Sequence, residues 1–126
     1  MTARILVVDD EPDLEALIVQ RFRRQVRAGE LSFCFAADGV AALALLAEDA
    51  AIDMVLTDIN MPRMDGFGFI EGVRKDQRYR SVPILVLTTE GETEKKDRAR
   101  RAGATGWIVK PFDPEKLINA IRRLAA

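Results

Sequence analysis

Short apolar segments alternate along the chain with longer segments in which apolar residues recur every three or four positions. A short, continuous apolar run is typical of a parallel strand covered on both faces, and the longer period is typical of a helix with one buried face. The pattern therefore predicts strands and helices in strict alternation. We expect strands at residues 5–8, 31–36, 54–56, 83–87 and 107–109, and helices at residues 13–28, 41–49, 65–77, 93–102 and 114–124.

This alternation predicts a single domain over residues 1–126, of the α/β class, with helices on both faces of a parallel sheet. Crossovers between parallel strands are right-handed, which leaves few strand orders open. We expect the doubly wound, flavodoxin-like order 2-1-3-4-5, with five strands and five helices. In that order the first and third strands are neighbours.

Several helix ends and one buried helix face can be predicted from residue types. Asp113 is expected to cap the last helix, with Pro114 at its first position, and Gly103 is expected to end the helix at 93–102. In the first helix we expect a buried stripe formed by Leu14, Leu17, Ile18, Phe22 and Val26.

Composition narrows the classes of function. The net charge is −1, so no overall field favours nucleic acid or a membrane surface. The absence of histidine excludes imidazole acid–base catalysis, Ser-His-Asp chemistry and histidine–zinc sites. We expect a cytoplasmic protein for three reasons. The chain has a single cysteine, and no apolar stretch approaches the ~20 residues of a membrane span. The first predicted strand begins so early that it leaves no room for a signal peptide.

Polar side chains follow four of the predicted strands, at the edge where ligands bind in open parallel sheets. Asp9 and Asp10 follow the first strand, Asp58 the third, Thr88 the fourth and Lys110 the fifth. Carboxylates are ligands for a hard divalent cation, and a hydroxyl and an ammonium can contact a phosphoryl group. The sequence therefore predicts a site for a metal ion and a phosphoryl group at this edge.

The motifs around these positions resemble one family. Taken in order and at this spacing, they are similar to the receiver domains of two-component response regulators, and in particular to chemotaxis-type regulators. The matching segments are Val7 to Glu11, Thr57 to Pro62, Asp65-Gly66, Leu87-Thr88 and Lys110 to Phe112.

The resemblance implies that Asp58 accepts a phosphoryl group from the phosphohistidine of a sensor histidine kinase or phosphotransfer protein. It also implies Mg²⁺ as cofactor, with Mn²⁺ as an expected substitute. Asp10, Asp58 and the main-chain carbonyl of Asn60 would be direct ligands, and Asp9 would act mainly through water.

Other positions take implied roles in switching. Lys110 would pair with Asp58 and later with the phosphoryl group, and the Thr88 hydroxyl would move to the phosphoryl oxygen. Trp107 occupies the position of the switch aromatic, so the expected output face comprises the helix at 93–102, the strand at 107–109 and the helix at 114–124. A Trp is the largest occupant of that position, which leaves open whether it transmits the signal.

The remaining implied roles concern the lifetime and partners of the phosphorylated form. Asn60 and Glu90 would tune dephosphorylation, and this pair suggests a short-lived phosphoform. We expect a downstream effector, no direct contact with nucleic acid or membrane, and a monomer unless activated. The domain would be a signalling module that catalyses only its own phosphorylation and dephosphorylation.

Other hypotheses about the function stay open. The chain could be a phosphorylation-independent receiver-fold module for protein interaction, and it could be a stand-alone regulator or a receiver cut from a longer protein. An aspartate-nucleophile phosphatase is disfavoured, because that class needs a second Asp where this chain has Asn60. A flavodoxin-type FMN protein is disfavoured because Asp9, Asp10 and Glu11 would repel phosphate. The basic run at 95–101 is either a solvated face or a surface for an acidic partner.

Overall fold

The structure is a computed structural model that describes residues 2–48, 51–59, 65–88, 93–109 and 113–124. Its centre is a parallel sheet in the order β2-β1-β3-β4-β5, which confirms the predicted order. The strands are β1 (Ala3–Val8), β2 (Leu31–Ala36), β3 (Met54–Asp58), β4 (Ile84–Thr88) and β5 (Gly106–Val109).

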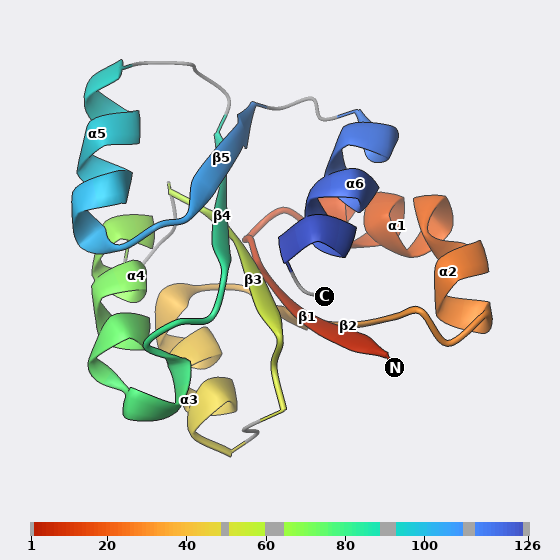
Figure 1. Cartoon of the computed structure of the whole chain (residues 1–126), viewed down its shortest axis with the longest axis horizontal. Coiled ribbons are helices and arrows are strands. Elements are labelled where there is room, and N and C mark those ends of the chain that lie inside the picture. Colours follow the sequence, from red (N-terminus) through yellow and green to blue (C-terminus); the bar gives the residue numbers. More distant parts are fainter. Residues whose placement is uncertain (1, 49–50, 60–64, 89–92, 110–112, 125–126) are drawn as a thin grey trace.

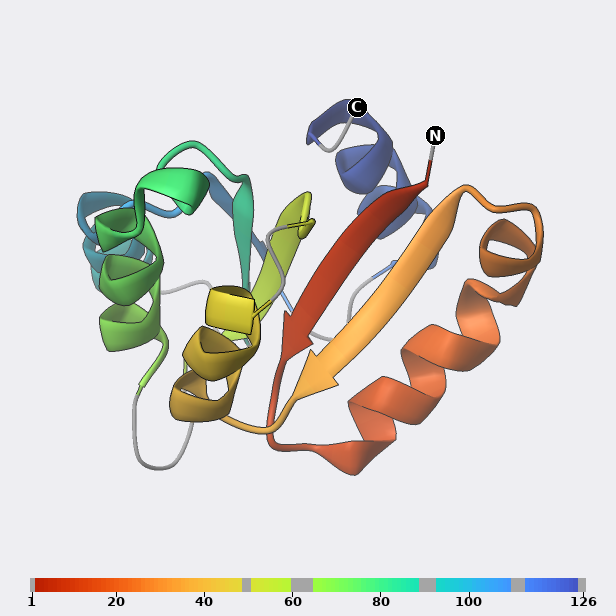
Figure 2. The same cartoon turned by 90° about the horizontal axis from the view of Figure 1, so that it is seen from below.

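Helices cover both faces of this sheet. One face carries α3 (Gly39–Glu48), α4 (Gly66–Lys75) and α5 (Thr93–Ala102), and the other carries α1 (Pro12–Arg21), α2 (Arg23–Arg27) and α6 (Pro114–Leu124) (Figure 1). Figure 2 shows the same three layers from below, with β1 and β2 running side by side between the two helical layers. Among the described residues, no helix has both the length and the apolar content that a membrane span requires.

The alternation of side chains along each strand divides the interior into two cores. In β1, Leu6 and Val8 pack into the core under α3, α4 and α5, whereas Ile5 and Val7 pack into the core under α1 and α6. All four side chains are almost completely buried. A strand buried on both faces needs apolar residues at every position, which explains the continuous runs in the sequence.

The first predicted helix differs from the structure in two respects. It is divided at Phe22, whose backbone leaves the helical region with φ −109° and ψ 19°, so α1 and a short α2 replace one helix at 13–28. The Phe22 side chain is buried and lies against Phe33, with 5.9 Å between ring centroids. The break therefore accompanies a side chain that is held in the core.

The predicted stripe of this helix is also too wide. Leu14, Ile18 and Phe22 are buried, but Leu17 is 37% exposed and Val26 is 44% exposed. Helix α2 contacts β2, which lies at the edge of the sheet. A helix over an edge strand covers only a narrow line of side chains, so the flanking apolar residues stay in solvent.

Helix and strand ends otherwise lie within two residues of the predictions. The Asp113 carboxylate accepts a hydrogen bond of 2.9 Å from the Glu115 backbone N–H, as a capping residue does. Gly103 follows α5 with φ +117°, a conformation that favours glycine. The predicted helix at 65–77 ends at Lys75 and is followed by a 3-10 turn, η1 (Gln77–Tyr79).

Candidate functional site

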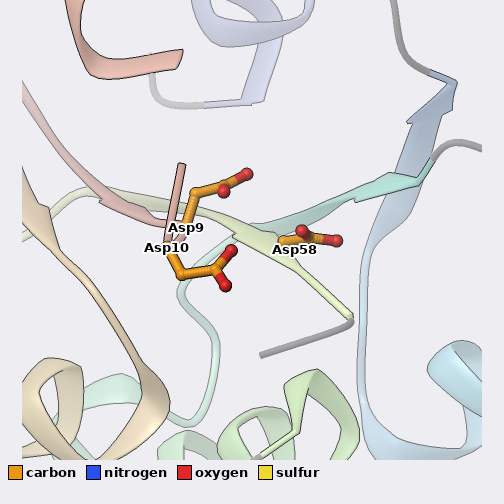
Figure 3. Close-up of side chains that lie close together, drawn as sticks. All are labelled: Asp9, Asp10 and Asp58. Atoms are coloured by element: carbon orange, nitrogen blue, oxygen red, sulfur yellow. The ribbon is translucent and has the colours of Figure 1, made fainter. Parts of the chain in front are cut away.

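Two neighbouring strands bring three carboxylates together. Val8 of β1 pairs with Thr57 of β3, so Asp9, which follows β1, and Asp58, the last residue of β3, lie side by side. Oxygen atoms of Asp9, Asp10 and Asp58 all lie within 4.8 Å of one another. Figure 3 shows the three side chains next to each other where β1 and β3 end.

The three carboxylates differ in their exposure to solvent. Asp58 is only 9% exposed, Asp9 is half-buried and Asp10 is exposed. The cluster is therefore closed on the β3 side and open on the side of Asp10. A ligand that reaches the cluster from solvent meets the exposed Asp10 before the half-buried Asp9 and the buried Asp58.

Hydrogen bonds from the backbone orient the buried carboxylate. The Ile59 N–H donates to Oδ1 of Asp58 over 2.7 Å, and the buried Thr57 hydroxyl donates to the Asp58 carbonyl oxygen over 2.9 Å. These contacts involve the two residues on either side of Asp58 in the chain. The Ile59 N–H thus holds one oxygen of the carboxylate at the end of β3, and the Thr57 hydroxyl holds the Asp58 main chain.

Asp9 has a different local role. Its Oδ1 accepts a hydrogen bond of 2.8 Å from the Glu11 N–H, and its own backbone N–H donates to the carbonyl of Ala36, at the end of β2, over 3.1 Å. Asp9 therefore shapes the turn that leads from β1 into α1. One of its carboxylate oxygens therefore accepts a hydrogen bond from the backbone of this turn.

The start of α4 is packed directly on Asp58. A Cβ atom at Gly66 would lie 2.4 Å from the Asp58 carbonyl oxygen and 2.6 Å from the Ile59 Cα, and the Gly66 N–H donates to the Ile59 carbonyl over 2.7 Å. Only glycine permits this approach of two backbones. The sequence pointed to Gly66 as part of a motif, but the close packing on Asp58 cannot be read from residue types.

The donor set fits a hard divalent cation. Carboxylate oxygens are the protein ligands that Mg²⁺ prefers, together with water molecules that it retains. Three negative charges within 4.8 Å also repel one another, and a bound cation would offset that repulsion. Among the described residues, Asp9, Asp10 and Asp58 are the group that offers several carboxylate ligands close enough together to hold one cation.

The other predicted site residues are placed only in part. Thr88 ends β4, where its neighbour Leu87 pairs with Asp58, so its backbone lies on the strand adjacent to the cluster. The Thr88 side chain, together with Asn60, Glu90 and Lys110, lies outside the described residues. Their roles remain predictions.

Trp107 lies on β5, half-buried against the core beneath α5. The Lys96 ammonium is 5.0 Å and the Arg100 guanidinium 5.2 Å from its ring centroid. Sequence reasoning predicted the position of Trp107 but missed its two cationic neighbours. The available signal was their spacing of four residues, which places both on one side of a helix that leads into this strand.

Comparisons with known proteins agree with this arrangement. A family model for the response regulator receiver domain matches residues 5–122. A chemotaxis protein CheY homolog from Campylobacter jejuni is 35% identical over 114 residues, which cover 90% of this chain and 85% of that protein. The structure of the chemotaxis response regulator CheY4 of Vibrio cholerae is 41% identical with a TM-score of 0.86, and the match covers 98% of this chain and 99% of that one.

A third comparison concerns the metal. The receiver domain of the sensor histidine kinase PA1611 from Pseudomonas aeruginosa PAO1 is 25% identical with a TM-score of 0.87, over 99% of this chain and 98% of that one, and its structure has a magnesium ion coordinated in the active site cleft. The fold and the family match together place this protein in a class. The chain belongs to the family of response-regulator receiver domains, and it is similar to chemotaxis regulators of the CheY type. A receiver domain is a signalling module rather than a metabolic enzyme.

Proposed function

We propose that this receiver domain accepts a phosphoryl group on Asp58 and that the modified carboxylate changes the face formed by α5, β5 and α6. The donor is the phosphohistidine of a sensor histidine kinase or phosphotransfer protein. The observation that carries the proposal is the convergence of Asp9, Asp10 and Asp58 within 4.8 Å, with Asp58 as the buried and backbone-oriented member.

The chemistry is a transfer from nitrogen to oxygen. A carboxylate oxygen of Asp58 forms a bond to phosphorus, the phosphorus–nitrogen bond breaks, and the imidazole keeps the electron pair and takes up a proton. In dephosphorylation, which resets the switch, water attacks phosphorus, the bond between phosphorus and the Asp58 oxygen breaks, and inorganic phosphate leaves. The Ile59 N–H holds Oδ1 of Asp58, so the nucleophile does not have to be ordered at the moment of reaction.

A carboxylate is a poor nucleophile toward an anionic phosphoryl group, and a magnesium ion bound here would neutralise part of that charge. Asp10, Asp58 and the carbonyl of Asn60 would hold the ion directly, and Asp9 would act mainly through water. The magnesium ion in the cleft of the PA1611 receiver domain supports this assignment. We expect Mn²⁺ to substitute.

Lys110, Thr88 and Trp107 complete the proposed switch. Lys110 would pair with Asp58 and then with the phosphoryl group, and the Thr88 hydroxyl would move toward a phosphoryl oxygen. Asn60 and Glu90 would set the rate of hydrolysis. The support for the roles of Thr88, Lys110, Asn60 and Glu90 is their position in the sequence at or after the end of a strand, as in the family's motifs, and the support for Trp107 is its place on β5.

The partners follow from the same proposal. The domain would receive the phosphoryl group in the cytoplasm and would pass the signal to a downstream effector, without direct contact with nucleic acid or a membrane. We expect it to be a monomer unless activated.

The test is the intact mass of the protein after incubation with acetyl phosphate, with and without Mg²⁺. We expect one phosphoryl adduct that requires Mg²⁺ and is absent from Asp58→Asn. Asp53→Asn is the matched control, because Asp53 lies just before the same strand and its carboxylate accepts a hydrogen bond of 2.8 Å from the Arg4 N–H, far from the cluster. A folded protein that neither binds Mg²⁺ nor gains the adduct would instead favour a phosphorylation-independent interaction module.

A further inference from the structure

A buried hydroxyl group lies directly before Asp58 in β3. It belongs to Thr57, whose side chain is completely buried, and the three residues before it in the strand are apolar. The residues that pair with Thr57 on the two neighbouring strands are Val8 and Val86, both in the core under α3, α4 and α5. A hydroxyl in such a place lowers stability unless it is hydrogen-bonded, so its contacts should show what it does.

One peptide group connects this hydroxyl to the Asp58 carboxylate. The Thr57 hydroxyl donates a hydrogen bond to the Asp58 carbonyl oxygen over 2.9 Å, and the Ile59 N–H donates to Oδ1 of Asp58 over 2.7 Å. That carbonyl and that N–H are the two ends of the same peptide group, which is planar. A hydroxyl that holds the carbonyl therefore also sets the direction in which the N–H points.

Gly66 at the start of α4 restricts the same peptide group. A Cβ atom at Gly66 would lie 2.4 Å from the Asp58 carbonyl oxygen and 3.2 Å from the Asp58 carbonyl carbon. The Gly66 N–H also donates to the Ile59 carbonyl over 2.7 Å, and the Ile59 side chain is buried. The Asp58–Ile59 peptide is therefore fixed by its packing on α4 together with the hydroxyl of Thr57.

Packing alone does not account for a hydroxyl at this position. Valine has nearly the same shape as threonine, and it already occupies the paired positions 8 and 86. A valine at position 57 would fill the same space without burying a polar group. What it would lose is the hydrogen bond to the peptide group that orients the Asp58 carboxylate.

We propose that Thr57 is a positioning residue for phosphoryl transfer: its hydroxyl fixes the Asp58–Ile59 peptide group, whose N–H holds the Asp58 carboxylate in the orientation that attacks phosphorus. The inference rests on the proposed function, because it gives Thr57 a part in the reaction of Asp58. The hydroxyl donates to the backbone, so it acts through the peptide group and not on the phosphoryl group. Its contribution is to order the nucleophile before the reaction, and rates are sensitive to small displacements of a reacting group.

Two substitutions separate the hydroxyl of Thr57 from its packing. Thr57→Val keeps the shape and removes the hydroxyl, whereas Thr57→Ser keeps the hydroxyl and removes a buried methyl group. Phosphorylation by acetyl phosphate is followed by intact mass over time with Mg²⁺ in excess, and urea unfolding gives the stability of each variant. Thr57→Ser should be less stable than the unaltered protein and yet keep most of the rate. Thr57→Val should fill the core and yet react about tenfold more slowly.

The NMR signal of the Ile59 amide reports the orientation without any phosphorylation. An amide proton that donates to a carboxylate is deshielded, so in Thr57→Val this signal should move upfield and its hydrogen exchange should accelerate. In Thr57→Ser both should stay close to those of the unaltered protein.

Thr105→Val is the matched control, because it also removes a hydroxyl that contacts the backbone. The Thr105 hydroxyl oxygen accepts a hydrogen bond of 3.0 Å from the N–H of Ile84, the first residue of β4, whereas Asp58 pairs with Leu87 near the other end of that strand. This variant should leave the rate and the Ile59 signal unchanged.

The proposed function and the role of Thr57 fail in different ways. An unaltered protein that gains no adduct would overturn the proposed function itself. If the adduct forms, a Thr57→Val rate within about twofold of the unaltered rate would overturn the role of Thr57. A slow Thr57→Val with an unchanged Ile59 signal would also overturn it, because the loss would not arise from the peptide group. Equal losses of rate in Thr57→Val and Thr57→Ser would overturn it in favour of packing.

Discussion

Asp58 is set apart from its two acidic neighbours by its burial and by the backbone on which it lies. Its side chain is 9% exposed, its Oδ1 is held by the Ile59 N–H, and its carbonyl is covered by Gly66. A carboxylate in such surroundings has a fixed orientation and two negatively charged neighbours. Both features can be tested by single substitutions.

Asp10→Asn should have opposite effects with and without a divalent cation. Without Mg²⁺, removal of one of three clustered charges relieves repulsion and should raise the free energy of unfolding by roughly 1 kcal/mol. The rise is no larger because Asp10 is exposed and solvent screens its repulsion of Asp58. With Mg²⁺, the rise in Tm that the unaltered protein shows should be largely lost, because a ligand is missing. Thermal unfolding with and without MgCl₂ measures both effects.

Asp13→Asn is the control for this substitution, since Asp13 lies in the first turn of α1 and outside the cluster. It should leave the Mg²⁺-dependent rise in Tm intact. A full Mg²⁺ effect in Asp10→Asn would remove Asp10 from the set of ligands.

Gly66→Ala should destabilise the protein by about 2 kcal/mol and slow the phosphorylation of Asp58. The added Cβ would be 2.4 Å from the Asp58 carbonyl oxygen, so the backbone on one side has to move. Gly72→Ala in the same helix is the matched control, because the atoms nearest to its Cβ belong to the flexible side chain of Leu43, from 3.0 Å, and alanine favours the helix. Urea unfolding of the two variants should differ clearly, and similar stabilities would show that α4 is not fixed on Asp58.

At the scale of elements, α5 is attached to the molecule differently from α4. In α4, five residues are buried, including Phe67, Phe69 and Ile70. In α5, Ala99 is buried and Ala102 is half-buried, while most other described side chains are charged. Small apolar area and cation–π contacts therefore hold α5, and a helix held in this way opens more readily than one with a large apolar face.

Trp107→Leu should loosen α5 without unfolding the sheet. Leucine keeps an apolar side chain on β5 but removes the ring from Lys96 and Arg100, and we expect the free energy of opening α5 to fall by about 1 kcal/mol. Amide hydrogen exchange of α5 should accelerate while that of α4 stays the same. Equal acceleration in both helices would indicate a general loss of packing and would contradict the assigned role of the ring.

At the scale of the whole molecule, an ion pair links segments that are 92 residues apart in the chain. Arg122 of α6 donates to both carboxylate oxygens of Glu30, at 2.7 Å and 3.1 Å, just before β2 begins. The hydrogen bond from Arg122 lowers the pKa of Glu30 below its ordinary value. The Glu30 carboxyl group therefore releases its proton more readily in the folded state than in the unfolded state.

The sign of the pH effect follows from this direction. The stabilisation from Glu30 is present above the pKa of the unfolded chain, near 4.5, and is lost as the pH falls through the lower pKa of the folded state. Glu30→Gln should therefore lower Tm slightly at neutral pH and reduce the loss of Tm in acid. Both side chains are partly exposed, so the effect should be small and should shrink in high salt.

Tm measured against pH in low and high salt tests this expectation. The two proteins should converge in acid, where Glu30 is protonated. Parallel curves at all pH values would show that the ion pair does not contribute.

The sequence predicted the sheet order and the acidic cluster because both depend on local patterns. A run such as Ile5 to Val8 identifies a buried strand, and Asp9 and Asp58 were predicted to meet because the carboxyl ends of neighbouring parallel strands share one edge. The exposure of Leu17 was not predictable from a helical period, which shows a face but not how much of it a sheet edge can cover. The packing of Gly66 on Asp58 depends on the path of a loop rather than on residue type.

The rings that hold α5 lie outside it, on β5 and α4, and the helix contributes long cations at positions 96, 98 and 100 beside the small apolar area of Ala99 and Ala102. Lysine and arginine can both lie over a ring, and among the described residues of α5 the exposed Glu94, Asp97 and Arg101 make no such ring contact. The helix can therefore change much of its sequence during evolution and still keep its place on the sheet. If α5 belongs to the output face as proposed, its partner preference can change without loss of the common fold.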